Sequence, residues 1–153
     1  MTPPEPPAET LHAYDWALVR VVPDARTGDA EAVGVALHAR RAGVLALRLA
    51  DAPDALAERL AARWPGLDAR LIACALSGMA EVADGRGGPL GRLPPSERFH
   101  WLVAARSSVL RAGPVRTGMS ADPAAEAGRI AAGLADARRG FSARRDPPDA
   151  RGV

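Results

Sequence analysis

The sequence predicts a single α+β domain, in which a small antiparallel sheet of three to four strands packs with about three to four helices. Three apolar runs of strand length, each bounded by turn residues, lie within residues 13–50. Two later segments, 53–64 and 67–83, repeat apolar residues at helical spacing. The 153 residues are about one domain's length, and an apolar share of 48% allows a hydrophobic core.

The domain is expected to span residues 11–139, between two polar ends. Residues 1–10 hold four prolines and two glutamates, and residues 140–153 are rich in Arg, Asp and Pro. Neither end has enough apolar area to bury, so we expect a disordered leader and a disordered tail. The isoelectric point near 9.4 reflects residues 138–153, which carry five arginines against two acids, because residues 10–137 contain 15 arginines against 14 acids. The nearly neutral body argues against nucleic-acid binding.

The first strand is expected from Ala13 to Val22, and Pro23 should close it because proline cannot donate to a ladder. Both faces of this strand are largely apolar, which suits a central position in the sheet. Arg20 interrupts one apolar stripe, so its guanidinium needs a partner. The sequence leaves two alternatives: an ion pair with a carboxylate of the following loop, which we favour, or an anion site at the sheet end.

The second and third strands are expected at residues 31–40 and 44–50, after a polar loop with three carboxylates between residues 24 and 31. The loop lacks the regular alternation of a calcium site, so no metal is expected there. The small residues around Gly34 indicate that another element approaches closely. The two expected faces of the second strand are Val33, Val35, Leu37 and Ala39 on one side and Ala32, Gly34, Ala36 and His38 on the other.

Two helices should follow, one opening at Pro53 and one covering residues 67–83. In the second, Cys74 falls in an apolar arc with Leu71, which predicts a buried and inert thiol. Residues 84–95 are rich in glycine and contain two arginines. They match no phosphate-binding motif and follow a helix, so a connector is the better interpretation.

The last third of the domain is expected to hold two helices and a short strand. Residues 95–103 fit a helix or a strand by pattern, and their Pro-Ser-Glu start favours the helix. A short strand is expected at residues 109–111. The final helix should be capped by Asp122 and run to about Arg139.

The single cysteine excludes an intrachain disulfide, and no apolar run approaches the length of a membrane span. The N-terminus lacks the basic start and apolar run of a signal peptide. We therefore expect a cytoplasmic protein that makes no membrane contact. No nucleophile–base pair or cofactor loop is visible, so no cofactor is expected.

Several segments together resemble a small bacterial family known as domain of unknown function 3037. They are Tyr-Asp-Trp-Ala-Leu-Val-Arg-Val-Val-Pro-Asp at 14–24, Val-Gly-Val at 33–35, Ser-Glu-Arg-Phe-His-Trp-Leu-Val-Ala-Ala-Arg-Ser at 96–107, and Thr-Gly at 117–118. The resemblance covers about residues 12–138. It implies a fold but no mechanism, since the family has no established activity. Where the family pattern has an Asn before Val-Gly-Val and a His before Thr-Gly, this chain has Ala32 and Arg116.

The function we favour from the sequence is a non-enzymatic protein-interaction or accessory protein with a protein partner. The alternative is a site for phosphate or another anionic ligand, with or without catalysis, formed by arginines at the sheet end. Its candidate residues are Arg20, Asp24, Arg98, Arg106 and Ser107. Asp24 would be the base if the site were catalytic.

Overall fold

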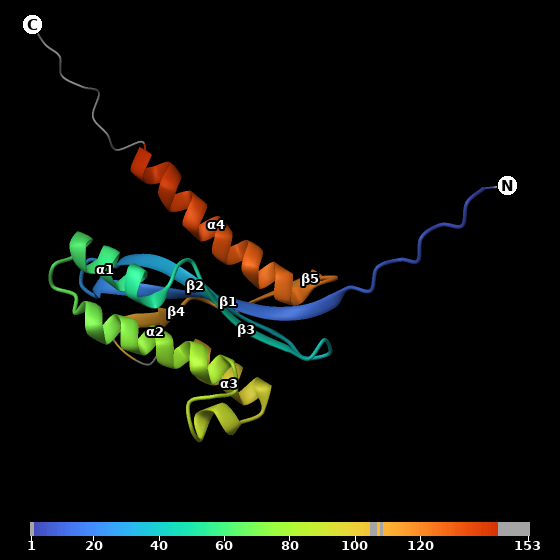
Figure 1. Ribbon diagram of the computed structural model, residues 1–153, viewed down its shortest axis with the longest axis horizontal. Helices are drawn as coiled ribbons and strands as arrows, with labels where there is room; N and C mark the ends of the chain where they lie inside the picture. The colour runs from blue at the N-terminus through green and yellow to red at the C-terminus, as the bar shows by residue number, and fades with distance from the viewer. Residues whose placement is uncertain (1, 105–106, 108, 144–153) are drawn as a thin grey trace, which may run out of the picture.

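The computed structural model describes residues 2–104, 107 and 109–143 and shows the predicted α+β fold (Figure 1). The strands are β1 (His12–Asp24), β2 (Asp29–Ala39), β3 (Val44–Leu49), β4 (Leu110–Ala112) and β5 (Arg116–Ser120). The helices are α1 (Pro53–Arg63), α2 (Ala69–Ala83), α3 (Pro95–Val103) and α4 (Pro123–Ala143), with a 3₁₀ turn, η1 (Leu90–Arg92), before α3. Residues 2–11 form neither helix nor strand, and most of the expected tail lies outside the described residues.

The sheet is antiparallel and is organised around β1, which has neighbours on both edges. Its order is β3-β2-β1-β4, and β5 also pairs with β1. Strand β4 pairs with Val19–Val21, and β5 pairs with His12–Trp16, so the two short strands share one edge of β1 end to end. The sequence predicted three to four strands. It missed β5 because Arg-Thr-Gly-Met-Ser has no apolar alternation.

The helices cover both faces of the sheet, with α1, α2 and α3 on one side and α4 on the other (Figure 1). The first core joins alternate residues of β1, such as Val19 and Val21, to Leu56, Leu76 and other side chains of α1–α3. The second core joins strand residues to α4: Tyr14, Val35, Leu37, Ala39, Ala46, Ala127 and Ala131. Because β1 and β2 are buried on both faces, their apolar residues do not alternate with polar ones.

One residue of β2 lies on the face opposite to the predicted one. Val33 was expected beside Val35, but it packs in the first core, whereas Val35 packs in the second. The pairing with β1 shifts between Val19 and Arg20, which leaves Val33 as an extra residue in a bulge. The bulge reverses the alternation, and nothing in an unbroken apolar run predicts where it occurs.

The second helix faces the core with a different side from the predicted one. Ile72 and Leu76 are buried, whereas Leu71 is 68% exposed and Cys74 is exposed. The prediction of a buried Cys74 is therefore wrong. Helix α2 is apolar on nearly all sides, so periodicity did not decide which side packs on the sheet.

The predicted helix boundaries agree well with the structure. Pro53 is the first residue of α1, and residues 95–103 form helix α3 rather than a strand. Asp122 accepts a hydrogen bond from the Ala125 N–H at 3.1 Å, as expected of a helix N-cap. Helix α4 continues to Ala143, beyond the predicted end.

Gly34 confirms the predicted close approach of a neighbouring element. A Cβ built on Gly34 would lie 2.6 Å from the Arg48 carbonyl oxygen and 2.8 Å from Leu49 Cδ2, both on β3. The backbone of β3 therefore leaves no room for any side chain at this position. The close packing of β2 on β3 requires glycine here.

We expect Gly34→Ala to lower the free energy of unfolding by about 1–3 kcal/mol, because the added methyl group must push the β3 backbone away. Gly133→Ala is the matched control. A Cβ at Gly133, in α4, meets nothing within 4 Å, so alanine should be neutral or stabilising there. Urea denaturation of the three proteins measures both effects. Equal stability of Gly34→Ala and wild type would contradict the close approach.

Candidate functional site

A cavity of about 380 Å³ lies on the α2–α3 side of the sheet. Its walls come from α2, η1, α3 and β4, and Val19 of β1 forms part of its floor. This volume falls in the range of pockets that bind small ligands or protein side chains.

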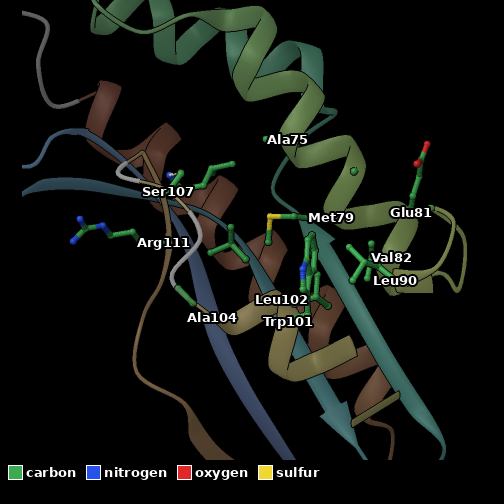
Figure 2. Close-up of a pocket in the computed structure, with 15 residues that line it drawn as sticks. Ala75, Met79, Glu81, Val82, Leu90, Trp101, Leu102, Ala104, Ser107 and Arg111 are labelled. Carbon is green, nitrogen blue, oxygen red and sulfur yellow. Dashed lines mark hydrogen bonds between the residues drawn. The ribbon is translucent and has the colours of Figure 1, made fainter. Parts of the chain in front are cut away.

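The cavity is lined almost wholly by apolar side chains (Figure 2). The larger ones are Val19, Met79, Val82, Leu90, Trp101, Leu102 and Leu110. Figure 2 shows the Glu81 carboxylate and the Arg111 guanidinium pointing away from the others, so these two residues do not place charge inside the cavity. The cavity therefore suits an apolar occupant.

The surface of α2 extends this apolar lining beyond the cavity. Ala75 and Gly78 line the cavity, and Leu71 lies one helical turn before Ala75 on the same side of α2. Leu71 is the most exposed of the large apolar side chains that the structure describes, at 68%. We call Leu71, Ala75 and Gly78 the α2 strip. The α2 strip therefore forms an apolar surface that leads from the solvent-exposed Leu71 to the cavity.

Arg20 has no carboxylate partner within the described part of the chain. The favoured ion pair with a loop acid is therefore wrong: Asp24 pairs with Arg26, Glu31 pairs with arginines of α1 and α4, and Asp29 makes no ion pair with Arg20. Arg20 is half-buried, and its guanidinium lies over Gly113, where a built Cβ would be 3.3 Å from Cζ and Nη2. Its neighbour across the β1–β4 pair is Arg111, a residue that the sequence analysis did not single out.

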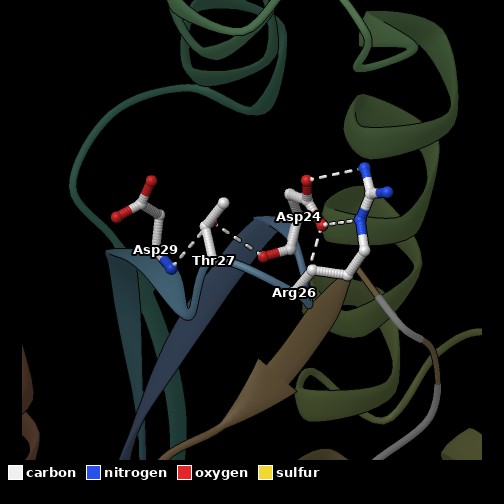
Figure 3. A network of polar contacts seen from close by, with 4 residues as sticks. All are labelled: Asp24, Arg26, Thr27 and Asp29. Carbon is white, nitrogen blue, oxygen red and sulfur yellow. Dashed lines mark hydrogen bonds and ion pairs between the residues drawn. The ribbon is translucent and has the colours of Figure 1, made fainter.

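Asp24 takes part in the turn between β1 and β2 (Figure 3). Its Oδ1 accepts from the Arg26 N–H at 2.9 Å and from Arg26 Nε at 3.2 Å, and its Oδ2 lies 3.1 Å from Arg26 Nη2. Arg26 thereby lowers the pKa of the Asp24 carboxyl. Thr27 completes the turn by donating its hydroxyl to the Asp24 carbonyl oxygen at 3.2 Å. These contacts describe a structural turn, in which the carboxylate is already occupied.

Arg98 connects the C-terminal end of α2 to the chain before α3. Its Nη1 donates to the carbonyl oxygens of Val82 at 3.1 Å and Ala83 at 2.8 Å, and its Nε donates to the Leu93 carbonyl oxygen at 2.9 Å. The last carbonyls of a helix lack intrahelical partners, so this guanidinium satisfies groups that would otherwise be unpaired. The contacts assign Arg98 a structural role.

The two remaining candidates lie near the start of β4. Ser107 Oγ accepts from the N–H groups of Val109 at 3.2 Å and Leu110 at 2.8 Å, so its hydroxyl orients the chain as it enters β4. Ser107 also lines the cavity. Arg106 lies outside the described residues. Among the candidates that are described, Arg20, Asp24 and Arg98 do not line the cavity, so the structure does not gather the predicted set into one pocket.

The residues that form the cavity were not predicted from the sequence. Leu90 was expected in a connector, and Met79 was not singled out, whereas both line the cavity. The usable signal was the composition of α2, whose apolar residues exceed what one buried face requires. The acids in the first loop raised the question of a metal, but no group of three or more metal-binding side chains occurs in the described ranges. In the same ranges, no helix is long and apolar enough to cross a membrane.

His38 is a buried histidine beside a smaller cavity of about 220 Å³ at the other end of the sheet. It lies opposite Asp15 in the β1–β2 pair, and its ring centroid is 5.6 Å from that of Phe99. Burial lowers the pKa of His38, and the nearby positive charge of Arg40 lowers it further. The fold therefore favours the neutral form of His38 over the protonated form.

This lowered pKa predicts the direction of a pH effect on stability. In the unfolded chain His38 regains its ordinary pKa of 6.5 and binds a proton more readily than in the folded protein. The contribution of His38 to the free energy of unfolding should be fully present above pH 6.5. It should fall as the pH drops from 6.5 towards the lowered pKa of the folded state. Urea denaturation at pH 7.5 and 5.5 measures the loss, and His38→Phe should reduce the difference. An undiminished difference in that variant would assign it to other groups.

The exposed Cys74 generates a prediction opposite to the one from sequence. Cys74 borders a groove between α1 and α2, so a thiol reagent should label it in the folded protein about as fast as in urea. Cys74→Ala should change the free energy of unfolding by less than about 0.5 kcal/mol. Labelling that requires unfolding would restore the buried interpretation.

Comparison with known proteins agrees with the resemblance found in the sequence. The family model described as Protein of unknown function (DUF3037) matches residues 16–134, most of the chain. No curated protein and no solved structure matches it. The matched region starts within β1, ends within α4 and includes the cavity and Arg20. The chain belongs to the DUF3037 family.

Proposed function

We propose that this protein is a non-enzymatic interaction module that binds apolar side chains of a partner protein in the cavity between α2, α3 and β4. The main support for this proposal is that the apolar lining of the cavity continues onto the surface of α2 as the α2 strip. A cavity of about 380 Å³ without charged groups pointing into it favours burial of apolar surface. The proposal assigns no reaction to the protein.

The exposed Leu71 favours a protein partner over a small molecule. A compound held within the cavity would cover Met79 and Trp101 but would leave Leu71 in solvent. A partner segment lying along α2 would cover both. Its central apolar side chains would enter the cavity, and its flank would contact Leu71, in the manner of an anchored interface.

Gly78 gives the partner room to approach the backbone of α2. A Cβ built on Gly78 meets nothing within 4 Å, although the residue lies on a helix and lines the cavity. Glycine within a helix costs stability relative to other residues, so open space at this position needs an explanation. Contact with a partner supplies one.

The proposal is tested by filling the cavity from Gly78. Gly78→Leu should fold normally, because the side chain enters open space and leucine is the better helix former. A photo-crosslinking residue introduced at Leu71 should capture a partner protein in cells. Gly78→Leu should reduce that crosslinked product by about tenfold or more, because the added side chain occupies the space that the partner needs.

Gly133→Leu provides the matched control, since it makes the same change at an open helical position on the opposite side of the sheet. It should leave the crosslinked product unchanged. Equal products from both variants would contradict the proposal. A small molecule that co-purifies with wild type and is lost from Gly78→Leu, without any crosslinked protein, would instead assign the cavity to a ligand.

A further inference from the structure

Two arginines lie directly opposite each other on the sheet face that is turned away from the cavity. Arg20 on β1 pairs in register with Arg111 on β4. Val19, Leu110 and Ala112 line the cavity, so strand alternation directs the side chains of Arg20 and Arg111 to the other face. Arg111 also borders the cavity, but its guanidinium points away from it (Figure 2). Like charges placed directly opposite on neighbouring strands destabilise a sheet unless something offsets them.

The charge of Arg20 is not offset within the described part of the protein. The guanidinium makes no hydrogen bond or ion pair there, although the residue is half-buried. Two carboxylates of the β1–β2 hairpin pair with other residues: Asp24 pairs with Arg26, and Glu31 pairs with Arg59, Arg63 and Arg138. A partly desolvated guanidinium without a partner is costly, which points to an occupant that the protein alone does not supply.

Gly113 fixes the position of this guanidinium. A Cβ on Gly113 would lie 3.3 Å from both Cζ and Nη2 of Arg20 and 3.4 Å from Nε. The three nearly equal distances show that the planar group lies flat over the glycine. The Gly113 N–H is bonded to the Leu18 carbonyl oxygen at 2.8 Å, so the strand edge holds this platform in place. The N–H groups at the rim of the guanidinium remain available to a ligand.

Arg111 adds a second charge that is accessible from solvent. It is exposed, and no ion pair or hydrogen bond of its side chain occurs among the described residues. Helix α4 packs on β2 and β3, where Ala127 and Ala131 contact Val35 and Leu37. The β1–β4 edge therefore lies beside α4 on this face, where a small ligand can reach both arginines.

We propose that Arg20 and Arg111 bind the phosphate group of a small phosphorylated compound. The fork of N–H donors on a guanidinium matches the oxygens of a phosphate. A phosphate monoester carries a charge of about −1.5 to −2 at neutral pH, which offsets two guanidinium groups, whereas a carboxylate offsets only one. The site lies on the opposite face from the cavity and does not depend on the proposed interaction function.

Calorimetric titration at constant ionic strength tests the site. The probes are inorganic phosphate and adenosine 5′-monophosphate, with sodium chloride as the reference. Wild type should bind both phosphate compounds. Arg20→Met and Arg111→Met should each raise the dissociation constant by about tenfold or more, because each loses a charge-assisted contact. Tighter binding of the nucleotide identifies an organic phosphate as the ligand, and equal binding identifies the phosphate ion itself.

Two further variants separate this site from general charge effects. Arg41→Met removes an exposed arginine in the β2–β3 turn, at the other end of the sheet, and should leave phosphate affinity unchanged. Gly113→Ala keeps both arginines but displaces the Arg20 guanidinium, so it should weaken binding. Arg111 is exposed, so its substitution should leave the fold intact. The Arg111→Met variant therefore tests the site even if Arg20→Met is unstable.

The proposal is overturned if wild type binds neither compound, or if Arg41→Met weakens binding as much as Arg111→Met. Binding of an oligonucleotide without binding of either phosphate compound would also overturn it, because that pattern requires an extended polyanion. Loss of phosphate binding in Arg20→Met, with the crosslinked product at Leu71 retained, would show that the two sites are separate, because Arg20 does not line the cavity.

Discussion

The structure depends on one constraint: β1 is paired along both edges and packed on both faces. Strand β2 occupies one edge, and β4 and β5 share the other. Neighbouring segments of the chain must pack close to such a strand. Along the edge that pairs with β4 and β5, glycine permits this close packing at two positions. Gly113 receives the Arg20 guanidinium, and Gly118 receives the Tyr14 ring, where a built Cβ would lie 2.5 Å from Tyr14 Cζ. The Thr-Gly pair of the family pattern thus has a physical explanation in the packing of Tyr14.

The two helical layers are tied together at the start of β2 by Glu31. Its carboxylate lies 3.6 Å from Arg63 of α1 and 3.6 Å from Arg138 of α4, with Arg59 at 4.0 Å. Arg138 also donates to the Ala32 carbonyl oxygen. Glu31 Oε2 and Arg138 Nη1 are buried and have no hydrogen-bond partner among the residues that the structure describes, so these residues do not fully satisfy the pairing. Such a cluster contributes less to stability than to fixing how the C-terminal half of α4 lies on the sheet.

The sequence predicted the elements because local rules govern them, and it failed where distant residues decide the outcome. Apolar runs and capping residues located β1–β3 and the helix starts, as Pro53 and Asp122 show. The face of α2 could not be predicted, because that helix is apolar on most sides and its contacts with the sheet and α3 select one. The bulge at Val33 and strand β5 likewise depend on pairing with β1. The cavity forms from four separate elements, so its lining had no local signature.

The arginines show why residue type alone did not locate a site. Arg98 and Arg20 were both candidates for an anion site in the sequence. In the fold, Arg98 donates from Nε and Nη1 to three backbone carbonyls, two at the end of α2 and one at Leu93. Arg20 meets the surface of Gly113, which offers no acceptor to it, and faces another cation across the strand pair. Burial with acceptors makes a guanidinium structural, whereas burial without acceptors leaves binding capacity for an anion. The difference is set by Gly113 and Arg111, which are distant from Arg20 in sequence and adjacent to it only because β4 completes the edge of β1.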